Sequence, residues 1–320
     1  MNFLTASGIS TENLQRLEEN LRQSVIEDEF IKKSCTPLIQ GGKRLRPMLF
    51  LLCANSREKI SVEKILPLAV ALELIHTASL VHDDILDSSK KRRGIETSNS
   101  KYGAQIAVLI GDYLFAKAFQ LVAEGNYGDE VALILSKLVK NLCRGEIMQD
   151  LSLFKIPTLD EYYERINLKT AIFLSTCCRL GGIVSGLNRT EVDGLTNYGN
   201  SLGIAFQIVD DLLDFFGEEK ITGKSLGSDL KSGVITLPVI RTLQVSNDKN
   251  ILREIINKKN VAQEEINSAV KIVRATDAFT YCKLRAKAHI ESAGISLPQI
   301  KKSVKLALEQ AADFVVMRNF

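Results

Sequence analysis

The chain has 320 residues, of which 45% are hydrophobic, enough for a large buried core. Its formal net charge of +3 is too small for bulk electrostatics to favour nucleic acid or an anionic membrane surface. It contains no Trp and only 6% aromatic residues, which leaves little material for stacking bases. We therefore expect no nucleic-acid partner.

The six cysteines form no CxxC pair and lie mostly within apolar helical patterns, where Cys acts as a small hydrophobe. This usage suits a reducing compartment, so we expect a cytoplasmic protein. The first twelve residues lack the basic and apolar regions of a signal peptide. The most apolar segment, Ile65–Val81, is interrupted by Glu73 and His76, so it predicts a buried helix and no transmembrane segment.

Helical periodicity is nearly continuous along the chain, and strand-like alternation is nearly absent. Thr158 with Glu161 forms a capping box, and the six prolines fall near expected helix starts or junctions. No linker or internal repeat divides the sequence, so we expect a single all-α domain over residues 1–320. The helices are expected at 10–34, 44–55, 61–87, 103–124, 128–152, 158–187, 190–217, 234–245, 249–257, 262–291 and 297–317.

Two acidic triplets stand at the ends of long apolar helices: DDILD with Asp83, Asp84 and Asp87, and DDLLD with Asp210, Asp211 and Asp214. Residues i and i+4 lie on one helix face, so the first and last aspartates of each triplet stack one turn apart. A carboxylate at a helix C-terminus is disfavoured by a few tenths to ~1 kcal/mol, and like charges one turn apart repel. A solvated acidic helix end would explain one such triplet, but two copies favour a cation site.

The cation should be a hard one, because six carboxylates without a His or Cys cluster offer only oxygen ligands. Mg²⁺ fits this donor set, and Mn²⁺ is an alternative, whereas zinc is disfavoured. Mg²⁺ usually bridges a few carboxylates to substrate phosphates, so a diphosphate ligand is expected.

Basic residues that could hold a diphosphate lie near the first triplet. In GGKRLRP, a flexible Gly pair precedes Lys43 and Arg46, which are three residues apart, and Arg92 and Arg93 follow DDILD. Arg binds phosphate as a fork and Lys as a point charge. Alone, the KKRR run would be a solvated loop, but beside a carboxylate cluster it favours phosphate binding.

The segments GGKRLRP, DDILD, RRG, KTA, GIAFQIVDDLLD and GKSLGSDL, from about residue 38 to 240, resemble the trans-isoprenyl diphosphate synthase family. The nearest resemblance is to medium- and long-chain members, including hepta- and octaprenyl diphosphate synthases. It implies an all-α helical bundle with a central active-site cavity. It also implies Mg²⁺-dependent head-to-tail condensation of isopentenyl diphosphate with an allylic diphosphate such as farnesyl diphosphate.

The resemblance implies a role for each motif residue. The metal ligands would be Asp83, Asp84, Asp87, Asp210 and Asp214, with Asp211 supporting them from behind. The allylic diphosphate would contact Arg92, Lys169 and Lys224, and isopentenyl diphosphate would contact Lys43, Arg46, His76 and Arg93. The reaction centre would be lined by Thr170 and Gln207, with support from Gln149 and Lys231. Metal and basic groups would stabilise the departing diphosphate, and the alkene would attack the allylic cation in a site closed to water.

Product length is expected to depend on the helix that ends at Asp83. Toward its N-terminus, the pocket side would present Ala78 with Ser79, then Leu74 with Ile75, then Ala71, each turn descending ~5.4 Å. Ala78 and Ser79 are small where short-chain members carry a bulky aromatic, so we expect a product of about six to eight isoprene units. Phe115 and Phe119 are either a deeper floor or ordinary core aromatics.

Other functions fit the motifs less well. A class I terpene cyclase should lack the second DDxxD and GGKRLRP, and a regulatory prenyl synthase subunit should have lost aspartates or basic residues. A lipid-binding helical protein would not need two metal sites, and a farnesyl or geranylgeranyl synthase is the alternative for product length. The family implies a homodimer with 103–124 at its interface, a small non-catalytic partner in some relatives, and peripheral membrane contact on product release.

Overall fold

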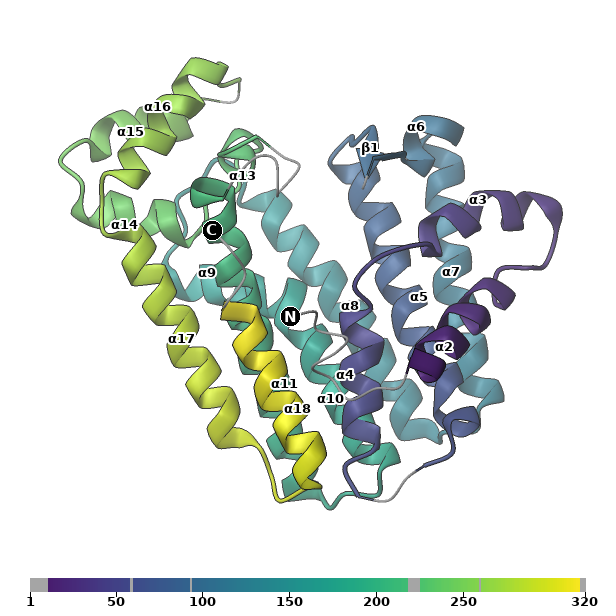
Figure 1. Cartoon of the computed structure of the whole chain (residues 1–320). Helices are drawn as coiled ribbons and strands as arrows, with labels where there is room; N and C mark the ends of the chain where they lie inside the picture. Colours follow the sequence, from purple (N-terminus) through teal and green to yellow (C-terminus); the bar gives the residue numbers. More distant parts are fainter. Residues whose placement is uncertain (1–10, 58–59, 93, 218–224, 259, 317–320) are drawn as a thin grey trace. The chain divides into compact units, whose positions relative to one another are not determined.

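The computed structural model describes residues 11–57, 60–92, 94–217, 225–258 and 260–316, and it is helical nearly throughout (Figure 1). The all-α prediction is confirmed. The chain packs into two compact units. The first unit comprises Met1–Val139, Thr176–Val192 and Gln299–Leu308, and the second comprises Lys140–Ser175, Asp193–Pro298 and Glu309–Phe320. The expectation of a single domain over 1–320 stays a prediction.

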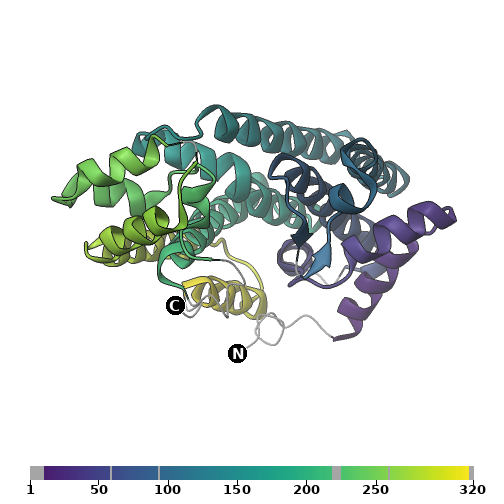
Figure 2. The same cartoon turned by 90° about the horizontal axis from the view of Figure 1, so that it is seen from above.

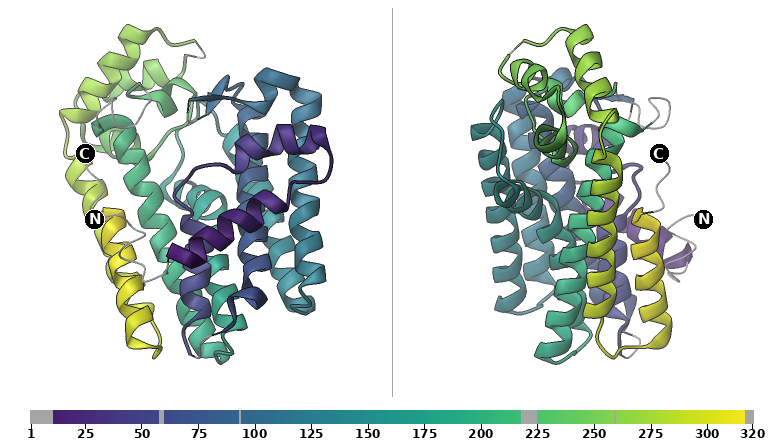
Figure 3. Two further views of the ribbon diagram at one scale, coloured as in Figure 1. Left: turned by 45° about the vertical axis from the view of Figure 1, so that its right-hand side comes forward. Right: turned by 90° about the vertical axis from the view of Figure 1, so that its left-hand side faces the viewer.

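The first unit is built around α5 (Val62–Leu86), which packs against α7, α4 and α2. Ala, Leu and Val occupy all sides of α5, so the helix has no polar stripe and is buried along most of its length. Figure 3 shows α2 and α3, in purple, beside the blue α5. The elements here are α2 (Thr11–Gln23), α3 (Glu29–Ile39), α4 (Leu45–Ala54), β1 (Lys91–Arg92), β2 (Ile95–Glu96), α6 (Ser98–Tyr102) and α7 (Ala104–Glu124).

The second unit contains the longest helix, α11 (Arg189–Phe216), of which all but the first turn belongs to this unit. Thr158 and Glu161 form the predicted capping box at the start of α9 (Leu159–Ile166). Three short helices, α14, α15 and α16, pack together beside α17 (Figure 2). The bounds are α13 (Ser228–Lys231), α14 (Leu237–Val245), α15 (Lys249–Ile256), α16 (Gln263–Arg274) and α17 (Ala278–Ser296).

Four of the described helices pass from one unit into the other along the chain: α11, whose first turn belongs to the first unit, and α8 (Asp129–Leu151), α10 (Ile172–Val184) and α18 (Lys302–Val316). Between α9 and α10 the backbone forms a π-helix, η1 (Asn167–Ala171). Such wide turns are rare and occur frequently at functional sites.

Several predicted helices are divided in the structure. The helix expected at 10–34 is two helices, because Asp28 caps α3 by accepting a 2.8 Å hydrogen bond from the Ile31 N–H. The helix expected at 262–291 stops at Arg274 and restarts at Ala278, whose N–H donates to Thr276 Oγ1. The hairpin of β1 and β2 was not predicted. The proline prediction was partly wrong, since Pro37 and Pro67 lie inside helices.

Two described helices, α5 and α7, are long and apolar enough to cross a membrane by length and composition. This is weak evidence for a span, since the core helix of a soluble protein passes the same test. The apolar window of α5 is 72% buried, as predicted for a buried helix, and that of α7 is 33% buried.

Candidate active site

The first acidic triplet lies where α5 ends. Asp87 is the C-terminal cap, and its N–H donates a 2.9 Å hydrogen bond to the Asp83 carbonyl, which keeps the two residues one helical turn apart. Asp83 is half-buried, Asp87 is exposed, and Asp84 is only 4% exposed. The three carboxylates therefore stand in three different environments.

Asp84 is held by Arg92 of the hairpin that follows α5. Arg92 Nε donates a 2.8 Å hydrogen bond to Asp84 Oδ1, and the hairpin turns at Gly94, whose φ of +79° is readily adopted only by glycine. Burial raises the pKa of the Asp84 carboxyl, while the Arg92 charge lowers it. Arg92, which is predicted to bind diphosphate, thus contacts the acidic triplet directly.

The segment GGKRLRP enters α4 through a turn in which Gly41 and Gly42 have φ of 72° and 97°. Lys43 is exposed, whereas Arg44 points inward and pairs with Glu18 and Glu73 at 2.6 and 2.7 Å. A buried guanidinium needs such partners, and this anchor fixes the turn. The structural role of Arg44 was not predicted, because sequence spacing does not show which basic residue is buried.

Arg46 and His76, which the resemblance assigns to the same substrate, lie close together, with 3.2 Å between Arg46 Nη1 and His76 Nε2. Nearby, a cavity of about 250 Å³ joins the Gly turn to the first acidic triplet, since Gly41, Asp84 and Arg92 all line it. Its remaining walls include Pro37, Leu38, Thr77, Val81 and Ile95. The first unit therefore combines carboxylates and a guanidinium around one small cavity.

The residues expected to control product length lie along α5. Side chains at four of these positions are fully buried, and Ser79 donates a 2.9 Å hydrogen bond to the His76 carbonyl. The fully buried ones are Ala71, Leu74, Ile75 and Ala78.

Phe115 and Phe119 are half-buried on α7. The Phe115 ring lies 5.7 Å from that of His82, next to the acidic triplet, and not deep along α5. Gly111 lets the two helices approach there, because a Cβ at this position would overlap the His82 imidazole. Phe119 lies one helical turn further along α7, so it remains the better candidate for a deeper floor.

The second acidic triplet ends α11 in the second unit. Asp210 is exposed, whereas Asp211 is 2% exposed and accepts hydrogen bonds from Tyr162 Oη at 2.7 Å and Gln207 Nε2 at 2.9 Å. Burial raises the pKa of Asp211 to about 7, although both hydrogen bonds lower it. This position agrees with a supporting role for Asp211.

Asp214 caps the turn that leads into α13. Its carboxylate accepts hydrogen bonds from the Ser228 N–H and hydroxyl at 3.0 and 2.7 Å, and from the Asp229 N–H at 3.2 Å. Ser228 and Asp229 of the GKSLGSDL segment are thereby bonded to the second triplet. Lys231 on α13 contacts Gln263 at 3.2 Å.

The π-helix brings the predicted reaction-centre residues together. Lys169 Nζ lies 2.7 Å from Glu146 Oε1 and 3.2 Å from Gln149 Oε1, and Thr170 Oγ1 donates to Gln207 Oε1 at 2.7 Å. Because Gln207 also donates to Asp211, a continuous hydrogen-bonded path runs from Thr170 to the second triplet.

Two glycines allow neighbouring helices to pack closely against this π-helix. A Cβ at Gly145 of α8 would lie 3.1 Å from the Lys169 backbone nitrogen, and one at Gly203 of α11 would overlap the Ala171 backbone. The wide turn is therefore packed from two sides, which holds Lys169 and Thr170 in place.

The donor set fits Mg²⁺, because all candidate ligands are carboxylates and Asp87 and Asp210 are exposed at helix ends. Within the part of the chain that the structure describes, no three His, Cys, Asp or Glu side chains converge as a metal site. Asp84, Asp211 and Asp214 are engaged by protein donors. Two predicted substrate ligands, Arg93 and Lys224, lie outside the described residues.

Sequence reasoning missed Tyr162, Glu146 and Arg165. Tyr162 and Arg165 lie on one face of α9, a single turn apart, and both are buried. The amphipathic pattern of α9 indicates that one of its faces is buried. No motif shows that Tyr162 on this face contacts Asp211. No spacing rule links Glu146 on α8 to Lys169, because the two residues lie on different elements.

Solved structures of the same architecture include heptaprenyl diphosphate synthase from Staphylococcus aureus, with a TM-score of 0.89, 30% identity, and coverage of 97% of this chain and 98% of that one. A decaprenyl diphosphate synthase from Rhodobacter capsulatus has a TM-score of 0.88, 32% identity and 96% coverage of both chains. The helices and their acidic ends thus define a prenyl-transferring enzyme of the isoprenoid synthase fold.

The family model described as polyprenyl synthetase matches residues 28–273, and the chain belongs to this family of trans-isoprenyl diphosphate synthases. It is 36% identical over 313 residues to a short chain isoprenyl diphosphate synthase of Methanocaldococcus jannaschii, covering 96% of this chain and 95% of the relative. It is 38% identical over 275 residues to heptaprenyl diphosphate synthase component 2 of Geobacillus stearothermophilus, with 84% coverage of each. The predicted family and enzyme class are confirmed.

Proposed function

We propose that this prenyltransferase condenses isopentenyl diphosphate with an allylic diphosphate, in the presence of Mg²⁺, to give an all-trans product of about six to eight isoprene units. The observation that carries the chemistry is the network of the second unit, in which Lys169 contacts Gln149, and Thr170 connects through Gln207 to Asp211. Relatives of similar identity are named as both short-chain and heptaprenyl synthases, so product length rests on the pocket residues.

Asp83, Asp84 and Asp87 of one motif, with Asp210 and Asp214 of the other, would hold Mg²⁺, which supplies charge to stabilise a departing diphosphate. For Asp84 and Asp214, this requires exchange of the hydrogen bonds that they make to Arg92 and Ser228. Arg92 would then be released from Asp84 to bind substrate phosphate. Its guanidinium can grip phosphate oxygens as a fork.

The protein's polar groups would position the reacting alkene. In the network, the Thr170 hydroxyl donates a hydrogen bond to Gln207 Oε1, so the lone pairs of the Thr170 oxygen remain to face positive charge. Lys169 would hold the allylic diphosphate, with Gln149 orienting its ammonium group. Arg46 and His76, 3.2 Å apart, would bind isopentenyl diphosphate with Lys43 and Arg93.

Product length is proposed to follow from the small buried residues of α5. Ala78 and Ala71 are both fully buried, seven residues apart, and lie on one face of the helix about 10 Å from each other along its axis. A growing apolar chain could follow this face beyond the length of farnesyl. Farnesyl or geranylgeranyl diphosphate as final product is the alternative.

We also propose that the chain forms a homodimer in the cytoplasm through α7. Three side chains exposed on this helix are apolar, with Leu109 61% exposed, and Ile106 and Val108 beside it. The six cysteines are free, which agrees with a reducing compartment. A small partner subunit is a further candidate, since the similar Geobacillus stearothermophilus protein is named as component 2 of a heptaprenyl synthase.

The test is to incubate the purified chain alone with Mg²⁺, labelled isopentenyl diphosphate and farnesyl diphosphate, and to size the products by chromatography. A ladder that ends at one polyprenyl length supports the proposal and shows that no partner is needed. A ladder that ends at farnesyl or geranylgeranyl would contradict the product length. No product with any allylic primer, even after cell extract is added, would contradict the activity.

A further inference from the structure

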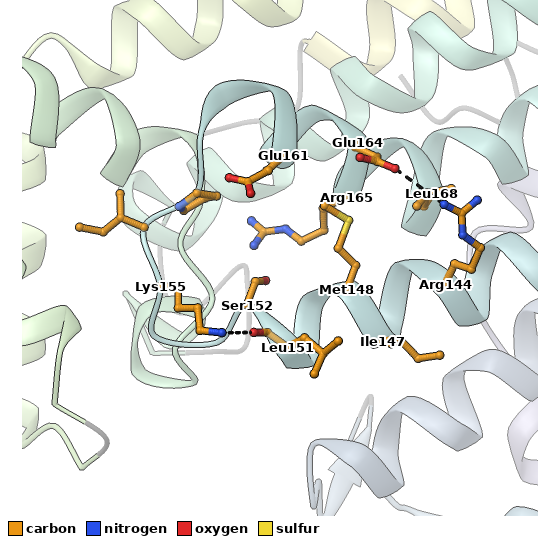
Figure 4. A pocket seen from close by; sticks show the side chains of 12 residues that line it. Arg144, Ile147, Met148, Leu151, Ser152, Lys155, Glu161, Glu164, Arg165 and Leu168 are labelled. Atoms are coloured by element: carbon orange, nitrogen blue, oxygen red, sulfur yellow. Dashed lines mark hydrogen bonds and ion pairs between the residues drawn. The ribbon is translucent and has the colours of Figure 1, made fainter.

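A second cavity lies in the second unit, and none of the residues that line it is assigned above to substrate or metal. It has a volume of about 590 Å³, is open to solvent on one side, and is lined by the end of α8, the following turn, α9 and Leu168 of η1 (Figure 4). This volume is within the range of pockets that hold small molecules. Half of its walls are apolar, namely Ile147, Met148, Leu151, Ile156, Pro157 and Leu168.

Arg165 places a buried positive charge at this cavity. It is only 5% exposed, its Nη2 donates a 2.6 Å hydrogen bond to the Ile235 carbonyl, and its guanidinium carbon lies 5.7 Å from the centre of the Tyr162 ring. None of the ion pairs within 4.0 Å among the described residues includes Arg165, and the Arg165 charge acts on the buried Asp211 carboxyl. Buried guanidinium groups are rarely left without an anionic partner, because their desolvation is costly.

The carboxylates at the cavity do not compensate this charge. Figure 4 shows Glu161 above Arg165, but the Glu161 carboxylate accepts hydrogen bonds from the Thr158 N–H and hydroxyl in the capping box. Glu164 lies 3.9 Å from Arg144. The side chains that line the cavity include three basic ones, Arg144, Lys155 and Arg165, and two acidic ones, Glu161 and Glu164, so basic charge is in excess by one.

Lys155 adds a second cation at the cavity. Its Nζ donates a 2.8 Å hydrogen bond to the Leu151 carbonyl, a neutral acceptor (Figure 4). An anionic group that entered could be bound by Arg165 through charge-assisted hydrogen bonds, which are the stronger kind.

We propose that this cavity is a second ligand site, which binds an amphipathic anion. The ligand's carboxylate or phosphate head pairs with Arg165, and its apolar chain lies against Met148, Leu151 and Ile156. Both a free fatty acid and a lipid phosphate have this chemistry, so the test includes one probe of each kind.

Ligand binding at this cavity should also affect the second acidic triplet. Arg165 lies over the Tyr162 ring, and the Tyr162 hydroxyl is bonded to Asp211 at 2.7 Å. A ligand that pairs with Arg165 is thus expected to change the rate of prenyl transfer without competing with substrate. This consequence rests on the proposed function, whereas binding at the cavity does not.

The test is calorimetric titration of the purified full-length chain with dodecanoate, below its micelle concentration. Mg²⁺ and excess inorganic diphosphate are present to occupy the groups that bind substrate diphosphate. We expect one saturable site, with dodecyl phosphate also binding and neutral dodecanol at least about tenfold weaker, since it lacks the charged head. The tighter of the two anions identifies the source of the natural head group.

Two variants locate the site. Arg165→Met should weaken dodecanoate binding by about tenfold or more, and Met148→Trp should abolish it by filling the cavity with the charge retained. Arg253→Met, at an exposed residue of α15, and Leu133→Trp, at the other end of α8, are the matched controls and should bind like the wild type. If Arg165→Met does not fold, Met148→Trp alone decides.

The proposal is overturned if dodecanol binds as tightly as dodecanoate, or if folded Met148→Trp binds dodecanoate like the wild type. It is also overturned if the wild type shows no saturable site. Because titration needs no turnover, these outcomes do not depend on whether the chain transfers prenyl groups.

Discussion

The hydroxyl of Tyr162 donates a 2.7 Å hydrogen bond to Oδ2 of Asp211, and both side chains are almost completely buried. The other oxygen of Asp211 accepts from Gln207, which in turn accepts from Thr170. A tyrosine on α9 thereby orients an amide and a hydroxyl on two other elements.

Tyr162→Phe should lower both stability and turnover. It removes one of two donors from a buried carboxyl group, which costs about 1.5–3 kcal/mol when the acceptor is ionised. We expect kcat to fall more than the KM for isopentenyl diphosphate changes, because Gln207 loses its fixed orientation. Urea unfolding and steady-state kinetics measure the two effects. Tyr163→Phe is the control, since its hydroxyl contacts Arg285 at 3.0 Å near the surface; equal kcat losses in both variants would refute the role of Tyr162.

Asp211 should make the metal-free protein less stable as the pH rises from about 4 to about 7. Its pKa is raised from 3.8 to about 7 in the fold, so the folded state binds a proton that the unfolded state releases. The stabilisation is complete below pH 3.8 and is lost as the pH approaches 7. Urea unfolding in chelator at several pH values measures this slope. Asp211→Asn should flatten it, and an unchanged slope in that variant would contradict the assignment.

Gly203→Ala should destabilise the protein by about 1–3 kcal/mol, since the added methyl group would overlap the Ala171 backbone and lie 2.9 Å from the Ala171 side chain. Relief would require η1 and α11 to move apart, which displaces Thr170 from Gln207. Gly294→Ala is the matched control, because nothing lies within 4 Å of a Cβ at this position. Its free energy of unfolding should increase by up to about 1 kcal/mol, because Ala favours the helix over Gly. Thermal unfolding measures the stability of both variants. Similar melting temperatures for the two would contradict the prediction.

Much of the architecture and part of the site could be predicted from the sequence. The two triplets were expected at helix ends, and α5 and α11 end within a residue of the predicted positions. Arg46 and His76 were expected to hold the same substrate diphosphate, and the structure places them 3.2 Å apart, although their contact itself was not predicted.

The rest depends on contacts between residues far apart in the chain. Apolar periodicity over 158–187 indicates a helix. It cannot show that the backbone forms a π-helix at Asn167–Ala171, where Gly145 and Gly203 allow α8 and α11 to pack closely against it. The contacts of Arg165 with Ile235, and of Tyr162 with Asp211, span 70 and 49 residues. Local sequence carries no signal for either.

Ala78→Phe should shorten the product, since a phenyl ring would block the proposed path one to two turns from Asp83. Ala71→Phe, on the same face and about 10 Å deeper, should stop growth later and give a product of intermediate length. Chromatography of labelled products tests this order. Unchanged product length in a folded Ala78→Phe variant would show that the chain does not grow along α5.

Asp87→Asn should reduce turnover by several orders of magnitude and raise the Mg²⁺ concentration needed for half-maximal rate. Asp87 is exposed at the helix end, so its replacement should leave stability nearly unchanged. The control is Asp112→Asn, an exposed aspartate on α7. A Mg²⁺ titration of the rate gives the measurement, and an unaltered titration curve for Asp87→Asn would remove this residue from the metal ligands.

The π-helix η1 restricts how the length of this chain can change between α9 and α10. A π turn holds one more residue than an α turn, and one residue in an α-helix corresponds to about 100° of rotation. The faces that α9 and α10 present are therefore out of phase by about a quarter of a turn. Deleting a single residue from Asn167–Ala171 would bring the two helices back into phase and rotate Lys169 away from Glu146. This segment should consequently tolerate substitutions far better than it tolerates a change of length.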